Sequence, residues 1–263
     1  MQDSLCWKGF PIFDNPGRTK VTHSPYDSFT SLHMKKLLSR IWWYIRTLIL
    51  VFLGSSLFFT LLYKWVPVYI TPLMVIRYSG NLLEGNDARI RRDWTPLEKI
   101  SPHLWLAVVA AEDNNFLNHF GFDLEAIEKA QKHNETHKRK RGASTISQQT
   151  AKNVFLWPAR TWVRKGLEVY FTFLIEVFWS KERILEVYLN VIETGDGIYG
   201  AEAAARNYFR KPALNLTRGQ SALIAAALPS PLSRNPAKPS AYLLKRQQWI
   251  LWNMNNIGKI EFE

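Results

Sequence analysis

The longest apolar stretch of the chain lies near its N-terminal end and is predicted to be a membrane-spanning helix. Residues 41–68 read IWWYIRTLILVFLGSSLFFTLLYKWVPV, and no charge lies between Thr47 and Tyr63. This length is close to the ~20 apolar residues that a helix needs to cross a bilayer core. A cleavable signal peptide is the alternative, but the stretch starts late, is long for such a peptide and lacks a small-x-small cleavage site. We therefore expect a retained anchor.

The charges beside this span predict its orientation. Four Lys and Arg residues lie between positions 35 and 46, whereas Lys64 is nearly alone on the other side until Arg77. Because positively charged flanks stay in the cytoplasm, we expect a cytoplasmic N-terminus and an outer domain over residues 69–263. Residues 1–40 show no sustained period, so we expect a poorly ordered cytoplasmic tail before the anchor at 41–68.

The pattern beyond the span predicts a mainly α-helical domain, since apolar positions recur at helical spacing and alternating strand patterns are few. Ser101-Pro102 opens one predicted helix, through residue 115, and Asp123 can cap a second, over 124–134. Thr145 and Gln148 have capping-box spacing at the start of a third. The remaining predicted helices span residues 160–179, 180–193, 200–209, 217–228 and 241–256.

One predicted helix has almost no polar face. From Leu167 to Trp179 nearly every position is apolar or aromatic. Two interpretations fit this pattern: the helix lies at the buried centre of the domain, or it faces lipid along part of its length. The sequence alone does not decide between these two interpretations.

The chain is basic, with a formal net charge of +12, and residues 65–263 still contain 26 Lys and Arg against 19 Asp and Glu. On a domain tethered to a membrane, such an excess is typical of a surface that faces anionic lipid or binds an anionic substrate. We prefer this interpretation to nucleic-acid binding. The only cysteine, Cys6, lies in the predicted tail, so the outer domain can form neither a disulfide nor a thiolate metal site.

Two acids are candidates for chemistry. Glu112 ends an apolar helix, where low-dielectric packing would raise the pKa of its carboxyl group and make it a usable base near neutral pH. Asp113 fits this description less well, and position alone favours two solvated charges, although the helix dipole opposes acids at that end. Glu168 lies inside the apolar helix, after Arg164 and Lys165. A structural ion pair explains it as well as a functional role does.

Cations and polar donors gather around these acids. The cations are Lys152, Arg160, Arg164 and Lys165, and a pyrophosphate group needs such a cluster of charge-assisted donors. Hydroxyl and amide groups near a predicted helix N-terminus suit an anion or a sugar; they belong to Ser144, Thr145, Ser147, Gln148, Gln149 and Asn153. Together these groups indicate sugar-phosphate chemistry. Lys138 and Lys140, in the basic loop nearby, are expected to matter less.

Five ordered motifs resemble those of the peptidoglycan glycosyltransferases, the lipid II polymerases of glycosyltransferase family 51. They are EDNNFLNHFGFD, RGASTISQQTAKN, RKGLE, SKERILEVYLN and GIYGAEAAARNYF. The resemblance runs from about Thr71 to Gly258 and is strongest to the monofunctional, membrane-anchored biosynthetic transglycosylases of Gram-negative bacteria. The chain has no S-x-x-K or K-T-G, which bifunctional relatives carry in a transpeptidase domain. The resemblance implies a lysozyme-like, mainly α domain with a small membrane-proximal jaw, on the periplasmic side of the bacterial inner membrane.

The resemblance also implies residue roles. Glu112 would be the general base that takes the proton from the acceptor GlcNAc 4-hydroxyl, which attacks C1 of the donor MurNAc and displaces undecaprenyl pyrophosphate. Glu168 would assist at the donor site or order the cations there. The residues matched to the donor pyrophosphate are Lys152, Arg160, Arg164 and Lys165. Those matched to other donor contacts are Ser144, Thr145, Gln148 and Gln149. The supporting residues are Asp113, His119, Gly121, Asp123 and Asn153.

Further expectations concern partners and cofactors. The implied partners are lipid II, the growing glycan strand and the membrane, with other cell wall synthesis or division proteins left open. No cofactor is expected and no acid cluster has metal-ligand spacing, although Mg or Mn could assist at the pyrophosphate. Ala143 stands where many relatives have a second glycine, and the tail 1–40 has no counterpart in the family pattern.

Two other functions are weighed against polymerisation. A lytic transglycosylase or muramidase would need an acid to protonate a glycosidic oxygen, but no cation cluster. A non-enzymatic, membrane-anchored wall-binding protein could keep the fold with a lost base, whereas both Glu112 and Glu168 are present here.

Overall fold

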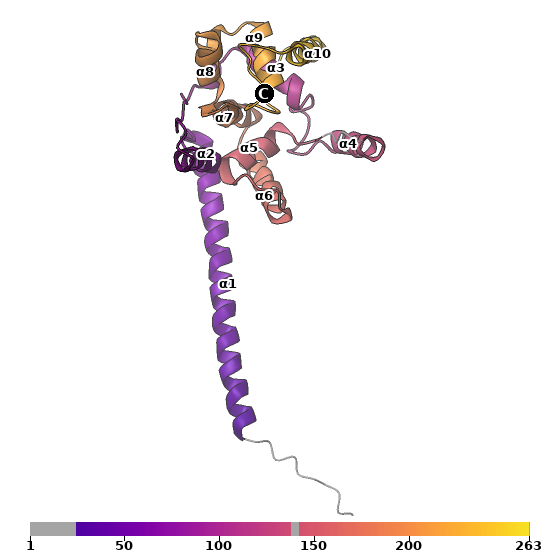
Figure 1. The fold of residues 1–263 in the computed structure, drawn as a ribbon. Helices are drawn as coiled ribbons and strands as arrows, with labels where there is room; N and C mark the ends of the chain where they lie inside the picture. The colour runs from indigo at the N-terminus through magenta and orange to yellow at the C-terminus, as the bar shows by residue number, and fades with distance from the viewer. Residues whose placement is uncertain (1–24, 138–141, 263) are drawn as a thin grey trace, which may run out of the picture. The chain divides into compact units, whose positions relative to one another are not determined.

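A computed structural model of the protein describes residues 25–137 and 142–262, with side chains from residue 34 onward. The chain divides into two units, Met1–Leu53 and Gly54–Glu263. The described part is mainly helical (Figure 1). Its α-helices are α1 (Pro25–Trp65), α2 (Pro72–Leu83), α3 (Pro102–Glu112), α4 (Leu124–Thr136), α5 (Ile146–Phe155), α6 (Trp162–Phe178), α7 (Lys181–Val191), α8 (Ala201–Ala204), α9 (Arg218–Ala227) and α10 (Ala241–Ile257). Short helices η1 (Leu97–Lys99), η2 (Ala205–Phe209) and η3 (Ala213–Asn215) and strands β1 (Glu193–Gly195) and β2 (Ile198–Tyr199) complete the list.

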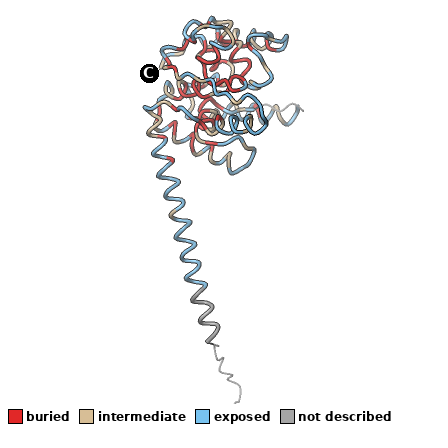
Figure 2. The backbone as a smooth tube through the Cα atoms, turned by 60° about the vertical axis from the view of Figure 1, so that its left-hand side comes forward, coloured by how far each residue is buried: buried red, intermediate tan, exposed pale blue. Residues whose placement is uncertain are grey.

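Helix α1 is long and apolar enough to cross a membrane. Its candidate span, Met34–Trp65, has 32 residues and a mean hydropathy of 2.0, and most of its described side chains are exposed (Figure 2). The helix begins at Pro25 and so includes residues 25–40, where the sequence predicted a poorly ordered tail. A helix that has formed in the apolar stretch extends readily into its polar flank, because propagation costs less than nucleation. The rest of the predicted tail, residues 1–24, lies outside the described residues.

The C-terminal end of α1 belongs to the second unit and is held there by polar contacts. The indole Nε1 of Trp179 donates to the carbonyl oxygen of Thr60 at 2.8 Å. The guanidinium of Arg183, on α7, donates to the carbonyl oxygens of Tyr63 and Val66 at 2.8 and 2.7 Å. The bond to Tyr63 satisfies a carbonyl in the last turn of α1 that has no partner within the helix. Together with the contacts of Trp179 and Val66, it fixes the end of α1 on the end of α6 and on α7.

Two groups of helices build the core. Helix α3 packs against α9 and α10, and α5 packs against α6 and α7. Helix α3 is buried over most of its length, from Leu104 to Ala110, and Figure 2 shows buried backbone concentrated in the second unit. Its helical geometry ends at Glu112, whereas the sequence predicted a helix through Asn115. The reason is Asp113, which leaves the helical conformation and uses its side chain to bind the start of α5.

The caps predicted at Asp123 and Thr145 are confirmed, whereas Ser101 precedes α3 without a side-chain capping bond. Asp123 accepts a hydrogen bond from Ala126 N at 2.8 Å, and Thr145 with Gln148 forms a capping box at the start of α5. Helix α2 and the antiparallel β1–β2 pair were not among the predicted elements. The two strands have only three and two residues, too few to show an alternating pattern.

The apolar helix α6 is not the buried centre of the domain, so that interpretation is wrong. Its apolar residues Val169, Phe173 and Val177 are exposed. Its two acids, Glu168 and Glu176, are buried beside Phe171 and Ile175. The acids can lie inside because each of them has a cationic partner, and the exposed apolar face is the one that the lipid-facing interpretation requires.

In the second unit, the buried side-chain amide of Asn190 joins the segment before α3 to α7. The side chain of Asn190 accepts from Thr95 N at 2.8 Å and donates to the carbonyl oxygens of Thr95 and Glu186 at 2.9 and 2.8 Å. Only 1% of Asn190 is exposed. The three bonds fix the segment before α3 on α7.

We predict that Asn190→Ala lowers the free energy of unfolding by about 2–3 kcal/mol, because it leaves both backbone groups of Thr95 buried without a partner. Denaturant unfolding of the full chain in detergent, followed by circular dichroism, measures this change. Asn86→Ala is the matched control, since the amide of Asn86 is exposed and bonds only to Glu84 at 3.0 Å. Equal changes in the two variants would contradict the assignment.

Candidate active site

Glu112 lies at the last turn of α3, with the buried helix behind it and a cavity of about 410 Å³ in front. Residues 142–145 and the first turns of α4 form two walls of this cavity, and Trp249 of α10 forms another. The amide Nε2 of Gln149 donates to Glu112 Oε2 at 2.9 Å. The hydroxyl of the fully buried Tyr188 donates to Gln149 Oε1 at 3.3 Å. The carboxylate is therefore oriented through Gln149, in contact with the cavity.

Burial raises the pKa of the Glu112 carboxyl group above its ordinary value. The hydrogen bond from Gln149 and the charges of Arg246 and Lys152 offset part of this effect, and Asp113 adds to it. Arg246 lies close because α10 packs against α3, and its guanidinium donates to the carbonyl oxygen of Ala111 at 3.3 Å. A carboxylate with a raised pKa is a stronger base, which suits it to proton transfer near neutral pH.

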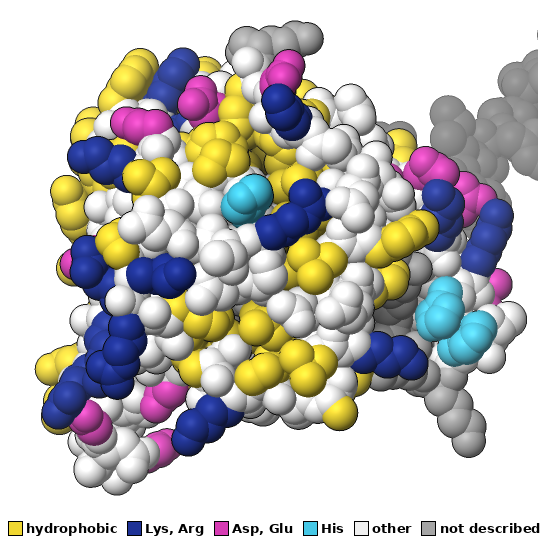
Figure 3. All heavy atoms as spheres, turned by 90° about the horizontal axis from the view of Figure 1, so that it is seen from above, with side chains coloured by type: hydrophobic (Ala, Val, Ile, Leu, Met, Phe, Trp, Pro, Cys, Tyr) yellow, Lys and Arg dark blue, Asp and Glu magenta, His cyan; other side chains and the backbone are white. Residues whose placement is uncertain are grey.

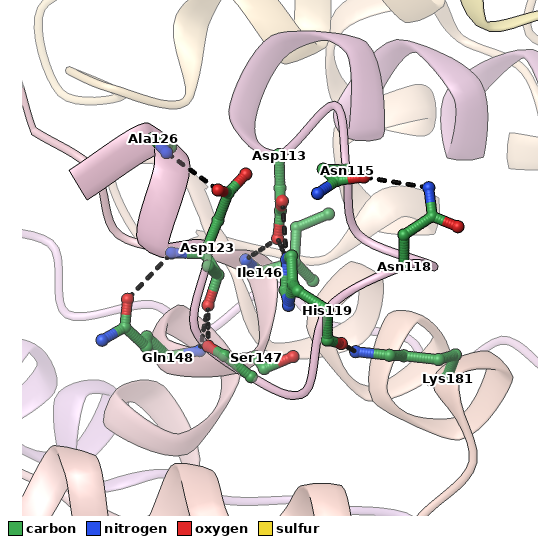
Figure 4. A network of polar contacts seen from close by, with 12 residues as sticks. Asp113, Asn115, Asn118, His119, Asp123, Ala126, Ile146, Ser147, Gln148 and Lys181 are labelled. Atoms are coloured by element: carbon green, nitrogen blue, oxygen red, sulfur yellow. Dashed lines mark hydrogen bonds and ion pairs between the residues drawn. The ribbon is translucent and has the colours of Figure 1, made fainter. Parts of the chain in front are cut away.

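A polar network holds the loop that follows Glu112 (Figure 4). Asp113 Oδ2 accepts from Ile146 N at 2.9 Å, and Asp113 Oδ1 lies 2.9 Å from His119 Nε2. Lys181 Nζ donates to the carbonyl oxygen of His119 at 2.6 Å and to Glu176 Oε1 at 2.8 Å. The structure thus brings the predicted supports Asp113 and His119 together, and adds Lys181 and Glu176 to them.

Gly121 lets the same loop approach α6 closely. Its φ is +75°, and a Cβ there would lie 2.8 Å from Thr172 Cγ2 and 2.9 Å from Glu176 Cγ. Its carbonyl oxygen accepts from Thr145 Oγ1 at 2.7 Å. Both the backbone conformation and the lack of space favour glycine at this position. Two residues later, Asp123 caps α4, so this pair of predicted supports shapes the wall of the cavity.

The polar residues at the start of α5 have two kinds of surroundings: some are buried in the helix cap, and others lie at the Glu112 cavity or contact Glu112. Thr145 and Gln148 are buried and bond to each other's backbone, at 3.0 Å for Thr145 N to Gln148 Oε1 and 3.2 Å for Gln148 N to Thr145 Oγ1. Ser144 is exposed and lines the Glu112 cavity, and Gln149 holds Glu112. Thr145 and Gln148 therefore build the helix start, and contact of these four residues with a donor stays a prediction.

Glu168 forms a compact ion cluster on α6. Arg164 Nη1 lies 2.7 Å from one carboxylate oxygen and Lys165 Nζ lies 2.5 Å from the other. The side chain of Glu168 is only 4% exposed. Because both oxygens are engaged, the carboxylate orders the two cations, which is the ion-pair interpretation that the sequence left open.

A second cavity, of about 530 Å³, is defined here as the cation cavity. Four cationic side chains line it, together with Asn153 and Glu193; the cations are Arg77, Lys152, Arg160 and Arg164. Burial lowers the pKa of Lys152, and the charge of Glu168 raises it, more than that of Glu112 does. The Glu112 cavity lies at the N-terminal end of α5 and the cation cavity at its C-terminal end.

Several residues that the structure places at these cavities were not among the predicted site residues. Tyr188 lies within the fourth motif, and its position in that motif was an available signal. Arg246 and Trp249 have no local signal, because their approach to Glu112 depends on the packing of α10 against α3. Among the described residues, no group of three or more His, Cys, Asp or Glu side chains is placed to hold a metal ion.

Comparisons with known proteins identify the family. A family model described as Transglycosylase matches residues 79–255. Proteins named biosynthetic peptidoglycan transglycosylase are 58% identical in Bacteroides thetaiotaomicron, over 87% of this chain and 92% of that protein, and 57% identical in Bdellovibrio bacteriovorus, over 80% and 83%. One from Yersinia pseudotuberculosis is 48% identical over 86% of this chain and 95% of its own length. The match over residues 79–255 includes Glu112, Glu168 and most of the cation cavity, and the chain belongs to the transglycosylase family.

Proposed function

We propose that this protein polymerises lipid II into the β-1,4-linked glycan strands of peptidoglycan and releases undecaprenyl pyrophosphate. The observation that carries the proposal is an oriented, partly buried Glu112 with a raised pKa, at one end of a helix whose other end carries four cations around a cavity. The names of the relatives support the same activity. A glycan-cleaving enzyme would need no cation cavity, and a wall-binding protein would need no oriented base.

In the proposed reaction Glu112 accepts the proton of the acceptor GlcNAc 4-hydroxyl. The oxygen attacks C1 of the donor MurNAc, and the bond from C1 to the pyrophosphate oxygen breaks, so that its electron pair leaves with undecaprenyl pyrophosphate. Lys152, Arg160 and Arg164 offset the charge that develops on the leaving group. Inversion requires attack opposite the leaving group, which fits a base and a cation cavity at opposite ends of α5.

Glu168 has a positioning role in this proposal. It holds Arg164 and Lys165 in fixed positions, at 2.7 and 2.5 Å, and Arg164 is the member of this pair that lines the cation cavity. A preordered cation needs no rearrangement when charge develops on the pyrophosphate.

We also propose that the chain spans the bacterial inner membrane once, with a cytoplasmic N-terminus and a periplasmic catalytic domain. The excess of Lys and Arg before the span supports this orientation. The exposed apolar face of α6 continues onto the loop after α3, where the rings of Phe120 and Phe173 lie 6.1 Å apart. Such a face suits a substrate whose polyprenyl tail stays in the bilayer. On the face drawn in Figure 3, Lys and Arg side chains are interspersed with other types rather than gathered into one basic surface.

We predict that Glu112→Gln lowers the rate of lipid II polymerisation by about 10²–10⁴-fold, because the amide cannot accept the proton. The assay uses the full chain in detergent and resolves glycan products by gel electrophoresis. The unfolding temperature is expected to stay unchanged. Glu128→Gln is the control, since Glu128 is exposed and paired with Lys132. A protein that cleaves finished glycan and ignores lipid II would overturn the proposed function.

Replacing Lys152 or Arg160 by glutamine is predicted to lower kcat/KM for lipid II on the order of 10²-fold, since each change removes a charge from the leaving-group site. Lys138 and Lys140, which were expected to matter less, lie outside the described residues. Lys132→Gln is therefore the control, because Lys132 is exposed on α4. Equal losses in all three variants would count against a pyrophosphate at this cavity.

The pH dependence of kcat/KM follows from two pKa shifts. Glu112 must be unprotonated and burial raises its pKa above 4.5, so activity is lost as the pH falls through that raised value. Lys152 must be protonated and burial lowers its pKa below 10.5, so activity is lost as the pH rises through that lowered value.

Lys152→Arg should move only the alkaline limb of the pH profile, to higher pH. Gln149→Ala should move the acid limb to higher pH, because it removes a hydrogen bond that favours the carboxylate. If the alkaline limb stays in place in Lys152→Arg, or the acid limb in Gln149→Ala, the assignment of that limb to Lys152 or Glu112 is contradicted.

A further inference from the structure

One of the cations that line the cation cavity lies on α2, just before the residues that the family model matches. Arg77 lies on α2 and lines the cavity with Lys152, Arg160 and Arg164, whereas the match to the family begins at residue 79. Helix α2 is fixed at its start, where the hydroxyl of Thr71 caps it by accepting from Met74 N. Arg77 therefore reaches the cavity from a well-formed helix that no motif assigns to the site.

The partner of Arg77 leaves most of its guanidinium available. Arg77 Nε lies 3.3 Å from Glu193 Oε1, and Nη2 lies 3.4 Å from Oε2. Both distances are long for charge-assisted bonds. The Arg77 side chain is 42% exposed, whereas that of Glu193 is 9% exposed. Because a guanidinium has five N–H donors, the pair holds one edge of Arg77 and leaves the other to a ligand.

Other donors of the cavity also need an acceptor. The amide Nδ2 of Asn153 and the Nε of Arg164 are buried without a hydrogen-bond partner among the residues that the structure describes. Asn153 is 95% buried, with 5% exposed. Buried donors are nearly always satisfied, so these point to a ligand rich in acceptor oxygens. Four cations, one of which has an unpaired Nε, and the unpaired amide of Asn153 fit a pyrophosphate.

The rest of the lining identifies the kind of pyrophosphate. Leu73, one turn before Arg77, lies in the wall with Leu156 and Trp157. An apolar wall beside a cluster of cations suits a charged head group that is bonded to a hydrocarbon chain. A polyprenyl pyrophosphate has this chemistry, whereas inorganic pyrophosphate has no hydrocarbon chain to contact the apolar wall.

We propose that Arg77 binds the polyprenyl pyrophosphate in the cation cavity and that Glu193 limits the strength of this binding. The inference rests on the proposed function and names a further residue of the same site. The carboxylate of Glu193 neutralises part of the Arg77 charge and repels an incoming anion. Product binding is thereby weakened, which favours release of the leaving group after each transfer.

The test measures equilibrium binding of farnesyl pyrophosphate to the full chain in detergent by titration calorimetry, with farnesol and inorganic pyrophosphate as comparison ligands. Arg77→Gln is expected to weaken binding by about fivefold or more, because a charge-assisted contact is lost and Glu193 is left unneutralised. Glu193→Gln is expected to tighten binding by about threefold, since the amide oxygen still accepts from Arg77. Arg89→Gln is the matched control, because Arg89 pairs with Asp87 and both side chains are 64% exposed.

The opposite signs of the two changes separate binding from mere structural support. An ion pair that only stabilises the fold would be weakened by either substitution, so weaker binding in both variants overturns the inference. An effect of Arg77→Gln no larger than that of Arg89→Gln overturns it as well. If Arg77→Gln lowers the unfolding temperature, Arg77→Lys retains the charge and is expected to bind between the wild type and Arg77→Gln; binding as weak as that of Arg77→Gln overturns the inference.

The two proposals fail separately. A chain that polymerises lipid II, but whose binding of farnesyl pyrophosphate is the same in all variants, refutes the role of Arg77 alone. A chain that does not polymerise lipid II, but shows the two opposite shifts, refutes the proposed function and keeps the pyrophosphate site. Equal affinity for farnesyl pyrophosphate and inorganic pyrophosphate would refute the polyprenyl assignment.

Discussion

The site depends on one hydrogen bond, from Ile146 N to the side chain of Asp113 at 2.9 Å. It joins the C-terminal end of α3 to the N-terminal end of α5, and it satisfies an N–H that the first turn of α5 cannot pair within the helix. Because the two helix ends are joined in this way, Glu112 faces Gln149, one turn into α5. Asp113 also contacts His119, and Lys181 donates to the carbonyl oxygen of His119. These contacts fix the loop that follows α3 and so stabilise the junction of α3 with α5. The position of the base is thus a consequence of how two helices meet.

Charge compensation explains the unusual exposure pattern of α6. A buried carboxylate is costly unless a cation and hydrogen bonds accompany it. Glu168 is paired with Arg164 and Lys165, and Glu176 is paired with Lys181. Both compensated acids lie on the inner face of α6 with Phe171 and Ile175, and Val169, Phe173 and Val177 are left on the surface. The helix consequently has an inner face that carries paired acids among core side chains, and an apolar outer face, which suits a lipid boundary.

Local signals in the sequence predicted much of the fold and less of the site. The caps at Asp123 and Thr145 and the order of most helices follow from residues close together in the chain. Helix α3 ends earlier than its apolar pattern indicates, because the competing bond comes from residue 146, far along the chain. The choice between the two interpretations of α6 needed the partners of its acids. Motifs located Glu112 and the cations, but Arg246 and Arg77 reach the cavities only through the packing of α10 and α2.

Helix α5 separates the charges of the site before any substrate is bound. The macrodipole places partial positive charge at the N-terminal end of a helix and partial negative charge at its C-terminal end. Glu112 and Asp113 meet the N-terminal end of α5, and Lys152 lies in its last turn with Arg160 shortly beyond. Each sign of charge therefore stands where the dipole stabilises it. The same helix stabilises the anionic form of the proposed base and retains cations for an anionic leaving group. Because Gln149 of α5 holds Glu112 and Lys152 belongs to the last turn of α5, this helix sets the distance between the base and a cation, and transition-state charge meets dipoles that are already oriented.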